Sequence, residues 1–250
     1  MRTRLYLDMP LQSGERLEAG SAAAQYLGRA LRMRRGDSLR VFNGRDGEYA
    51  ATIVGQARGS MTLELGDRLV DPATAQSESP LNLHLVQGVS RGERMDLVIQ
   101  KTTELGVSRI TPVLTRHGVV KLDAARGGNR QAHWQRVAIS AAEQCGRLEV
   151  PAIDTPLELD TWLGGLGKPN GGDARWLLDT RSGKTIGDVG AFDAGALRLL
   201  VGPEGGFSDD EYANAAANGF VSISLGPRVL RTETAGIAAV ALAQARFGDL

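Results

Sequence analysis

The sequence predicts an α/β protein with a small β-rich N-terminal part and a larger C-terminal part built on a parallel sheet. Three observations support this. Residues 1 to about 70 contain short runs that alternate apolar and polar residues. Residues 71–80, "DPATAQSESP", are polar and hold two prolines, as linkers often do. From residue 81 onward strand-like and helix-like segments alternate, which is typical of a parallel sheet covered by helices on both faces.

The composition is that of an ordinary globular protein. The chain has 250 residues, 42% of them hydrophobic, which suits one large domain or two modest ones. Basic and acidic residues number 29 each, so the total charge does not indicate a nucleic-acid partner, although a local basic patch stays compatible with it. A single cysteine excludes an internal disulfide. Three histidines without a CxxC pair argue against structural zinc, so we expect no metal.

Nothing in the sequence indicates a membrane. The N-terminus has no continuous apolar segment of the signal-peptide kind, and no apolar run approaches the roughly 20 residues that cross a bilayer. We therefore expect a soluble, cytoplasmic protein without a membrane partner.

The first part, residues 1–72, has the pattern of a small barrel. Two alternating runs, 38–44 and 48–56, are separated by Asn-Gly and Asp-Gly turn signals, and one helix-like stretch, 22–33, interrupts the strands. Residues 1–36 contain seven arginines and three acidic residues, an excess of four positive charges. A solvated charged face is the commoner cause of such an excess, and an RNA-contacting face is the sharper alternative.

We place the linker at residues 73–80 and the second domain at 81–250. The predicted strands are 81–89, 109–114, 175–180, 197–202 and 221–226, and the predicted helices are 93–106, 130–146, 208–219 and 231–247. In sheets of this kind, ligands bind in the crevice at the carboxyl ends of the strands.

Common nucleotide-binding motifs are absent. "SGKT", residues 182–185, resembles the end of a P-loop, but Leu178 stands where that motif needs glycine. "GGLGKPNGG", residues 164–172, lacks the glycine spacing of a dinucleotide-binding turn. A nucleotide-dependent α/β enzyme is therefore disfavoured.

Two loops carry the functional signal. "GPEGGF", residues 202–207, follows a buried strand; its proline stiffens the turn, and its glycines let a ligand approach the backbone. Ser208 and Glu211 then form a predicted capping box for the next helix. "LGPRVLRTETA", residues 225–235, has the same Gly-Pro start and two arginines before a helix, which favours anions. Paired bends at successive strand ends predict a site for a ligand with a nucleoside-like part.

At these two loops the chain resembles the knotted methyltransferases called SPOUT. More closely, it resembles the ribosomal RNA small subunit methyltransferase E family, which methylates N3 of a uridine in 16S ribosomal RNA. Further matching segments, which extend the resemblance over nearly the whole chain, are "LGRALRMRRGD" (27–37), "FNGRDGEY" (42–49), "QGVSRGERMDLVIQKTTELGVSRITPV" (87–113) and "AAEQCGR" (141–147). The segment "RHGVVKLD" (116–123) departs from the family pattern and leaves any role of His117 open.

The resemblance implies an N-terminal PUA-like β-barrel and a C-terminal parallel-sheet SPOUT domain with a trefoil knot, assembled as a homodimer. It implies S-adenosyl-L-methionine as cofactor and 16S ribosomal RNA or the small ribosomal subunit as partner. The implied cofactor contacts are Leu200, Gly202, Glu204, Gly205, Ser224, Leu225, Gly226, Leu230, Thr234 and Ala235. The candidate RNA contacts are Arg2, Arg4, Arg32, Arg34, Gln87, Arg91, Lys101, Arg116 and Arg147.

Methylation at uridine N3 requires that the N3 proton leave and that the negative charge on O2 and O4 be stabilised. Arg231 and Arg228 are the candidate cations, Arg231 being favoured because it adjoins a helix start. An alternative of equal weight is that these two arginines bind phosphate or form a salt bridge with Glu204 or Glu233. Glu204 orients the cofactor, pairs with an arginine or accepts the proton, and we prefer the orienting role.

Two other functions stay open on the sequence. One is another knotted RNA methyltransferase, acting on tRNA or on a ribose 2′-hydroxyl. The other is a non-catalytic RNA-binding protein. Intact glycine bends and both arginines argue against the second.

Overall fold

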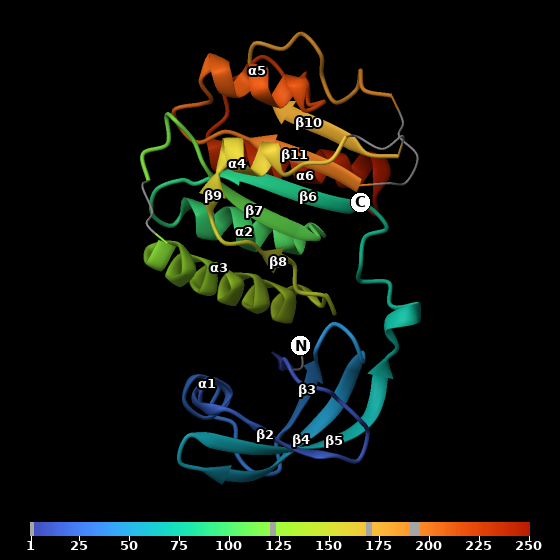
Figure 1. Ribbon diagram of the computed structural model, residues 1–250. Helices are drawn as coiled ribbons and strands as arrows, with labels where there is room; N and C mark the ends of the chain where they lie inside the picture. The colour runs from blue at the N-terminus through green and yellow to red at the C-terminus, as the bar shows by residue number, and fades with distance from the viewer. Residues whose placement is uncertain (1–2, 121–123, 169–171, 191–195) are drawn as a thin grey trace. The chain divides into compact units, whose positions relative to one another are not determined.

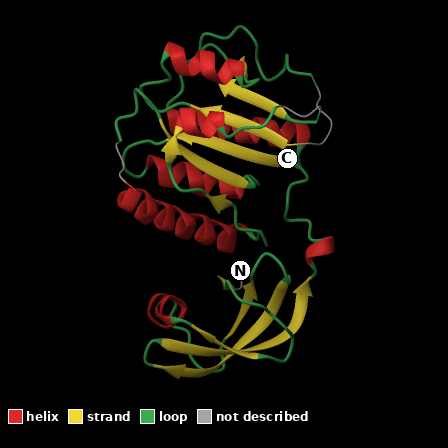
Figure 2. Ribbon diagram, in the orientation of Figure 1, coloured by secondary structure: helices red, strands yellow, loops and turns green. Residues whose placement is uncertain are grey.

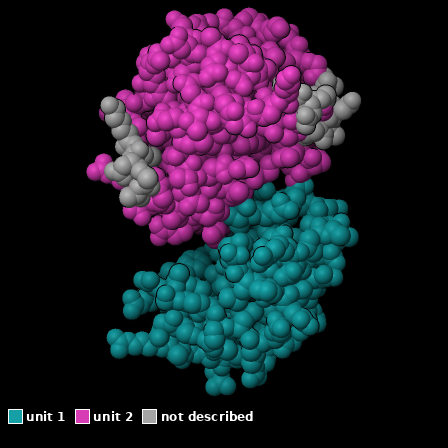
Figure 3. All heavy atoms as spheres, in the orientation of Figure 1, with its two compact units in different colours: residues 1–78, 142–150 teal, residues 79–141, 151–250 magenta. Residues whose placement is uncertain are grey.

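The computed structural model describes residues 3–120, 124–168, 172–190 and 196–250 (Figure 1). It divides into two compact units (Figure 3): unit 1 comprises Met1–Glu78 and Ala142–Val150, and unit 2 comprises Ser79–Ala141 and Pro151–Leu250. The sequence predicts a single boundary at 73–80 and gives no sign that residues 142–150 belong with the first unit. They do so because Ala142 and Leu148 bury apolar surface with Phe42.

Unit 1 is built on one five-stranded sheet, in which the described strands have the order β1-β3-β4-β5-β2 (Figure 2). The bounds are β1 Arg4–Tyr6, β2 Arg16–Ala19, β3 Ser38–Phe42, β4 Glu48–Ala57 and β5 Ser60–Val70. β1 pairs with β3 in parallel, and the other pairs are antiparallel. Leu27, Ile53, Met61 and Leu63 are fully buried in its core.

Unit 2 is built on a parallel sheet in which the described strands have the order β12-β10-β11-β6-β7-β8, with β9 also paired to β7. The strands are β6 Asn82–Gly88, β7 Arg109–Leu114, β8 Ala152–Ile153, β9 Leu157–Glu158, β10 Ala174–Leu178, β11 Ala196–Val201 and β12 Val221–Ile223. The helices are α2 Arg94–Glu104, α3 Ala124–Cys145, α4 Leu159–Gly164, α5 Asp209–Ala217 and α6 Thr232–Phe247. The last turn of α3 falls within unit 1.

Helices cover both faces of this sheet, as the sequence predicts. Side chains alternate along a strand, so neighbours in β6 point to opposite faces. Val86 packs in a cluster with Leu163 of α4 and Ala215 of α5. Its neighbour Gln87 reaches Thr232 of α6, which packs against α2.

The structure corrects several element limits. The predicted helix 22–33 is α1, Ser21–Gln25, continued by a π-helical turn, Tyr26–Ala30, and it ends before Arg32, whose φ is +57°. The predicted helix 130–146 already begins at Ala124. The predicted strand 221–226 ends at Ile223, because Ser224 forms only an isolated bridge with Thr185 and the chain bends from Leu225 onward. Strands β1, β2, β8 and β9 and helix α4 are too short for periodicity to reveal. No helix of the described residues is long and apolar enough to span a membrane.

A polar chain joins three strands of unit 2. His84 Nε2 lies 2.7 Å from Thr111 Oγ1, and Thr111 donates its hydroxyl proton to Asp154. Arg109 holds Asp154 with two bonds of 2.9 and 2.8 Å. Because the Thr111 proton is committed, its oxygen accepts from His84 Nε2–H. Burial, aided by Arg109, lowers the pKa of His84 from 6.5 to about 4, so His84 is neutral at pH 7.

We expect this histidine to make unit 2 sensitive to acid. Between about pH 6.5 and pH 4 the unfolded chain binds a proton at His84 and the native state does not, so the free energy of unfolding falls as pH falls through that window. The loss amounts to about 3 kcal/mol. Denaturant unfolding at pH 7 and pH 4, followed by the fluorescence of the tryptophans, which all lie in unit 2, measures it. His84→Gln should lose about 3 kcal/mol less than wild type over the same interval, and an equal loss would contradict the assignment.

Candidate functional site

The carboxyl ends of three neighbouring strands of unit 2 border a cavity of about 670 Å³. One wall is the bend after β11, residues 202–206, and another is the loop after β12, residues 224–231. The strand between them, β10, adds Asp179 and Thr180 just beyond its end. The two loops that the sequence singles out therefore meet at one site, at the sheet edge where parallel α/β proteins bind ligands.

Each glycine of the first bend has a separate structural reason. Gly206 has φ +69°, which favours glycine. Gly205 has ordinary φ, but a Cβ there would lie 2.7 Å from the carbonyl oxygen of His117. At Gly202 a Cβ would press on the Phe207 ring at 3.2 Å. Of the adjacent Gly205 and Gly206, only Gly206 therefore needs a positive φ. Gly205 is required because loop 115–118 lies too close to its backbone for a side chain.

The predicted capping box at the start of α5 is present. Ser208 accepts from the Glu211 amide, and Glu211 accepts from the Ser208 amide at 2.7 Å. Glu211 also accepts from the Arg116 amide at 2.9 Å, and the exposed Arg116 side chain pairs with Asp210 at 2.7 Å. The bend after β11 is therefore fixed to loop 115–118 on one side.

The other side of the same bend is tied to α6. The Thr232 hydroxyl donates to the Gly202 carbonyl at 2.5 Å, and Gln87 Nε2 donates to Thr232 Oγ1 at 2.9 Å. Gln87 is fully buried. The prediction of Gln87 as an RNA contact is therefore wrong, since its side chain lies out of reach of a macromolecule and holds the two loops together instead.

Arg94, at the start of α2, binds two of the cavity's acidic side chains. Its Nη1 lies 2.5 Å from Glu204 Oε1, and its Nε lies 3.9 Å from Glu233 Oε1. Partial burial raises the pKa of Glu204, but hydrogen bonds from its own backbone and from Arg94 outweigh this and leave the pKa below its ordinary value. Glu204 is therefore ionised at neutral pH, which suits an orienting role better than proton transfer.

Arg228 and Arg231 both line the cavity and are exposed. In the part of the chain that the structure describes, neither takes part in an ion pair. Their alternative assignment as partners of Glu204 or Glu233 is thus wrong, because Arg94 takes that place. Both guanidinium groups are left available to a bound substrate.

A third wall of the cavity escaped the sequence analysis. Arg181 lies 4.0 Å above the Tyr212 ring and pairs with Asp179 at 3.1 Å, and Tyr212 and Asp179 line the cavity. Burial raises the pKa of Tyr212, so its hydroxyl keeps its proton at neutral pH. Asp179 lies at the carboxyl end of the predicted strand 175–180, and the rule that parallel strands end at a common edge was the signal that could have identified it.

The structure places most of the expected cofactor residues at the cavity. Those that line it are Gly202, Glu204, Gly205, Ser224, Leu225, Gly226, Leu230 and Ala235. Leu200 is instead fully buried in the core with Val86 and Leu177. Thr234 is exposed on the first turn of α6 and is not among the lining residues.

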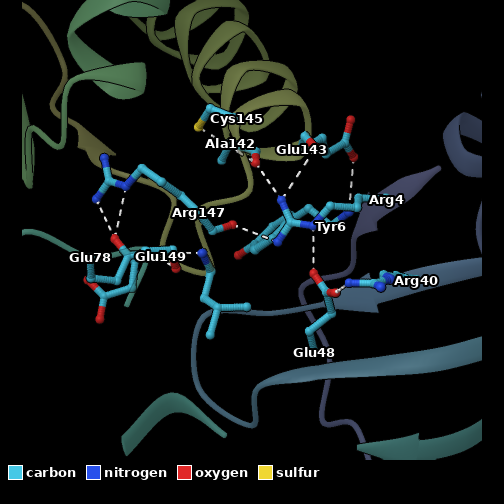
Figure 4. Close-up of polar contacts among 12 residues, drawn as sticks. Arg4, Tyr6, Arg40, Glu48, Glu78, Ala142, Glu143, Cys145, Arg147 and Glu149 are labelled. Carbon is cyan, nitrogen blue, oxygen red and sulfur yellow. Dashed lines mark hydrogen bonds and ion pairs between the residues drawn. The ribbon is translucent and has the colours of Figure 1, made fainter. Parts of the chain in front are cut away.

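Two of the expected RNA contacts are buried in unit 1 (Figure 4). Arg4 donates from Nε to Glu48 at 2.6 Å, from Nη1 to the Ala142 carbonyl at 2.6 Å and from Nη2 to the Arg147 carbonyl at 2.8 Å. The Arg147 guanidinium pairs with Glu78 at 2.9 Å. The assignment of Arg4 and Arg147 to RNA is therefore wrong, because their charges are enclosed and neutralised within the protein.

The remaining basic candidates lie at the surface. Arg32, Arg34 and Arg91 are exposed, and the half-exposed Lys101 pairs with Glu104 at 2.8 Å. Arg2 lies outside the described residues. Within those residues, no three histidine, cysteine, aspartate or glutamate side chains gather to hold a metal ion.

Comparisons with known proteins bear on this site. A family model described as "RNA methyltransferase domain" matches residues 77–244, and one described as "RNA methyltransferase PUA domain" matches residues 20–65. The chain is 32% identical over 247 residues to the Ribosomal RNA small subunit methyltransferase E of Buchnera aphidicola subsp. Schizaphis graminum, covering 99% of this chain and 97% of that protein.

Two solved structures resemble the whole chain. The Ribosomal RNA small subunit methyltransferase E of Neisseria gonorrhoeae bound to S-adenosyl methionine has a TM-score of 0.88, 32% identity and full coverage of both chains. A methyltransferase of Legionella pneumophila in complex with the bound cofactor SAM has a TM-score of 0.92, 37% identity and full coverage of both chains. The cavity described above lies within the segment that the first family model matches.

Proposed function

Because this chain belongs to the ribosomal RNA small subunit methyltransferase E family, we propose that it transfers a methyl group from S-adenosyl-L-methionine to N3 of a uridine in 16S ribosomal RNA. The expected fold is confirmed as an α/β protein with a PUA-like unit and a parallel-sheet SPOUT unit. The observation that carries the proposal is the meeting of both glycine bends at one cavity.

The residues of the cavity fit this cofactor. Its volume of about 670 Å³ lies within the roughly 300–1,000 Å³ typical of small-molecule sites. A Cβ placed on Gly206 or Gly226 would meet no protein atom within 4 Å, so there is space beside each bend. Backbone groups of the two bends line the cavity together with Leu225 and Leu230, and these residues would hold the adenine of the cofactor. The acidic side chains of Asp179 and Glu204 suit a sulfonium cation.

The residues of this chain would bind the cofactor, orient it and exclude water. When bound, S-adenosylmethionine supplies an activated methyl group, so positioning accounts for much of the catalysis. Arg231 and Arg228, exposed and unpaired among the described residues, would stabilise the negative charge that develops on uracil O2 and O4. Glu204, which is ionised and paired with Arg94, would orient the cofactor in the cavity.

The target base must leave its helix or lie in a loop, because N3 is on the Watson–Crick edge. Basic residues that are exposed or half-exposed would hold the RNA backbone. They are Arg32, Arg34, Arg91, Lys101 and Arg116. Such contacts are electrostatic and should weaken with salt.

The trefoil knot, the homodimer and the cytoplasmic location expected from the sequence are part of the same proposal. The partner at work would be 16S ribosomal RNA or the small subunit that contains it. The large apolar Leu97 of α2 and Leu242 of α6 are exposed on helices that pack together, which supports a second copy as partner.

A direct test combines binding and transfer. Calorimetric titration with S-adenosylmethionine should show one site with micromolar affinity. Small subunits that lack the modification should then gain one methyl group, found as N3-methyluridine after nucleoside digestion. Transfer to tRNA or to a ribose hydroxyl would identify another knotted methyltransferase. RNA binding without any transfer would identify a non-catalytic RNA-binding protein.

A further inference from the structure

One carboxylate in the cavity wall has an oxygen without a donor. Glu233 is the second residue of α6, is only 8% exposed and lines the cavity. Its Oε1 lies 3.9 Å from Arg94 Nε, and its Oε2 is buried without a hydrogen bond in the described part of the chain. A buried charged oxygen without a donor is unfavourable. Such a group in a ligand cavity indicates a donor that arrives with a ligand.

Arg94 places this carboxylate close to the surface. It lines the main cavity and also an open groove of about 580 Å³, whose other residues are Arg91, Gly92, Glu93, Val119 and Glu204. The Arg94 side chain is 44% exposed. Arg94, which pairs with Glu233, therefore lies where the cavity joins this open groove.

We propose that Glu233 and Arg94 together recognise the edge of the target uracil and that the Glu233 carboxylate accepts the N3 proton. This inference rests on the proposed function. Uracil presents a donor, N3–H, beside an acceptor, O4. A carboxylate beside a guanidinium presents an acceptor beside a donor, which is the complementary pattern. Cytosine presents an acceptor at N3 beside a donor at N4, which leaves both protein groups unsatisfied.

The proton leaves N3 before the methyl group is transferred to it. The N3–H bond breaks, the proton bonds to a carboxylate oxygen of Glu233, and the electron pair stays on N3. The resulting charge is shared with O4, next to the Arg94 guanidinium. N3 then bonds to the methyl carbon while the carbon–sulfur bond breaks, and that electron pair stays on the sulfur and neutralises its positive charge.

The other acidic side chains of the wall are less suited to accept this proton. Glu204 already accepts from Arg94 at 2.5 Å, and its pKa lies below the ordinary value. Asp179 is held by Arg181. The charged groups that share the cavity with Glu233 are Arg94 from α2, Glu204 from the bend after β11, Asp179 after β10, and Arg228 and Arg231 from its own loop. Thr232, which begins α6, and Gln87, which donates to it, are neutral.

The test compares Glu233→Gln with wild type and with Glu158→Gln, an exposed glutamate at the start of α4. Calorimetry with S-adenosylmethionine should give all three proteins affinities within threefold. Single-turnover methylation of unmodified small subunits should be about 10²- to 10⁴-fold slower in Glu233→Gln only, the usual contribution of a general base. The rate of Glu233→Gln should rise about tenfold per pH unit between pH 6 and 9, while that of wild type levels off.

Three outcomes for Glu233→Gln would overturn the inference. An equal loss of cofactor affinity would make Glu233 a cofactor ligand. An unchanged rate would remove it from the chemistry, and a slower rate with the wild-type pH profile would make its role structural. If wild type itself transfers no methyl group to uridine, the proposed function fails and the inference falls with it. Should Glu233→Gln not fold, Glu233→Asp tests the inference in its place. Its single-turnover methylation rate should be at least tenfold lower than that of wild type and should still level off as the pH rises.

Discussion

Replacing Arg4 with methionine should lower the free energy of unfolding of unit 1 by about 3–5 kcal/mol, the cost typical of breaking a buried ion pair. The Arg4 and Glu48 side chains are 7% and 3% exposed. Without the guanidinium, Glu48 keeps its bond to Arg40 among the described residues, and the carbonyls of Ala142 and Arg147 each lose a charged donor. Water cannot readily replace it in an enclosed site.

Amide hydrogen exchange in β3, β4 and β5 measures this loss, because it reports on unit 1 within the full chain. Arg16→Met is the matched control. Its partner is Glu64, the two side chains are 68% and 43% exposed, and such pairs contribute at most about 1 kcal/mol. If Arg4→Met left exchange unchanged and instead reduced the salt dependence of RNA binding, Arg4 would be the RNA contact that the sequence first indicated.

The burial of Arg4 could not be predicted from the sequence. A count of charges gives the arginine excess of the first 36 residues, but it does not say which guanidinium groups reach solvent. The partners of Arg4 lie 44 to 143 residues away in the chain, and they include the segment 142–150 that joins unit 1. Burial of a charge depends on such distant partners, and no local pattern reports them.

The site was predictable to the extent that it follows from strand order. Parallel strands end at one edge, so the bends after β11 and β12 had to lie close together, and the glycines marked them as unusual. Arg94 was missed because it lies on a helix start, 110 residues before Glu204, where an exposed arginine is the ordinary expectation. The reason for Gly205 was missed as well, since the approach of His117 is a long-range contact.

Replacing Gly88 with alanine should disrupt the cavity, although Gly88 is not itself among the residues that line it. Gly88 ends β6, between β11 and β7, and a Cβ there would lie 2.5 Å from the nitrogen of Pro203 and 2.9 Å from the carbonyl carbon of Gly202. These are backbone atoms, so the whole bend must shift. Because the Gly202 carbonyl also accepts from Thr232, the displacement reaches the second loop. We expect cofactor affinity to fall at least about 100-fold, which corresponds to about 3 kcal/mol.

Overpacking of this kind also destabilises a fold by about 1–3 kcal/mol, so binding and stability must be measured separately. Tryptophan fluorescence follows the unfolding of unit 2, and calorimetry with S-adenosylmethionine follows the site. Gly164→Ala is the control, since a Cβ there meets no heavy atom within 4 Å, and it should change neither measurement. A Gly88→Ala protein that unfolds cooperatively but no longer binds the cofactor places the effect at the bend. Retention of affinity within threefold would show instead that the bend can move without consequence, and the close contact between β6 and Pro203 would then not be what shapes the cavity.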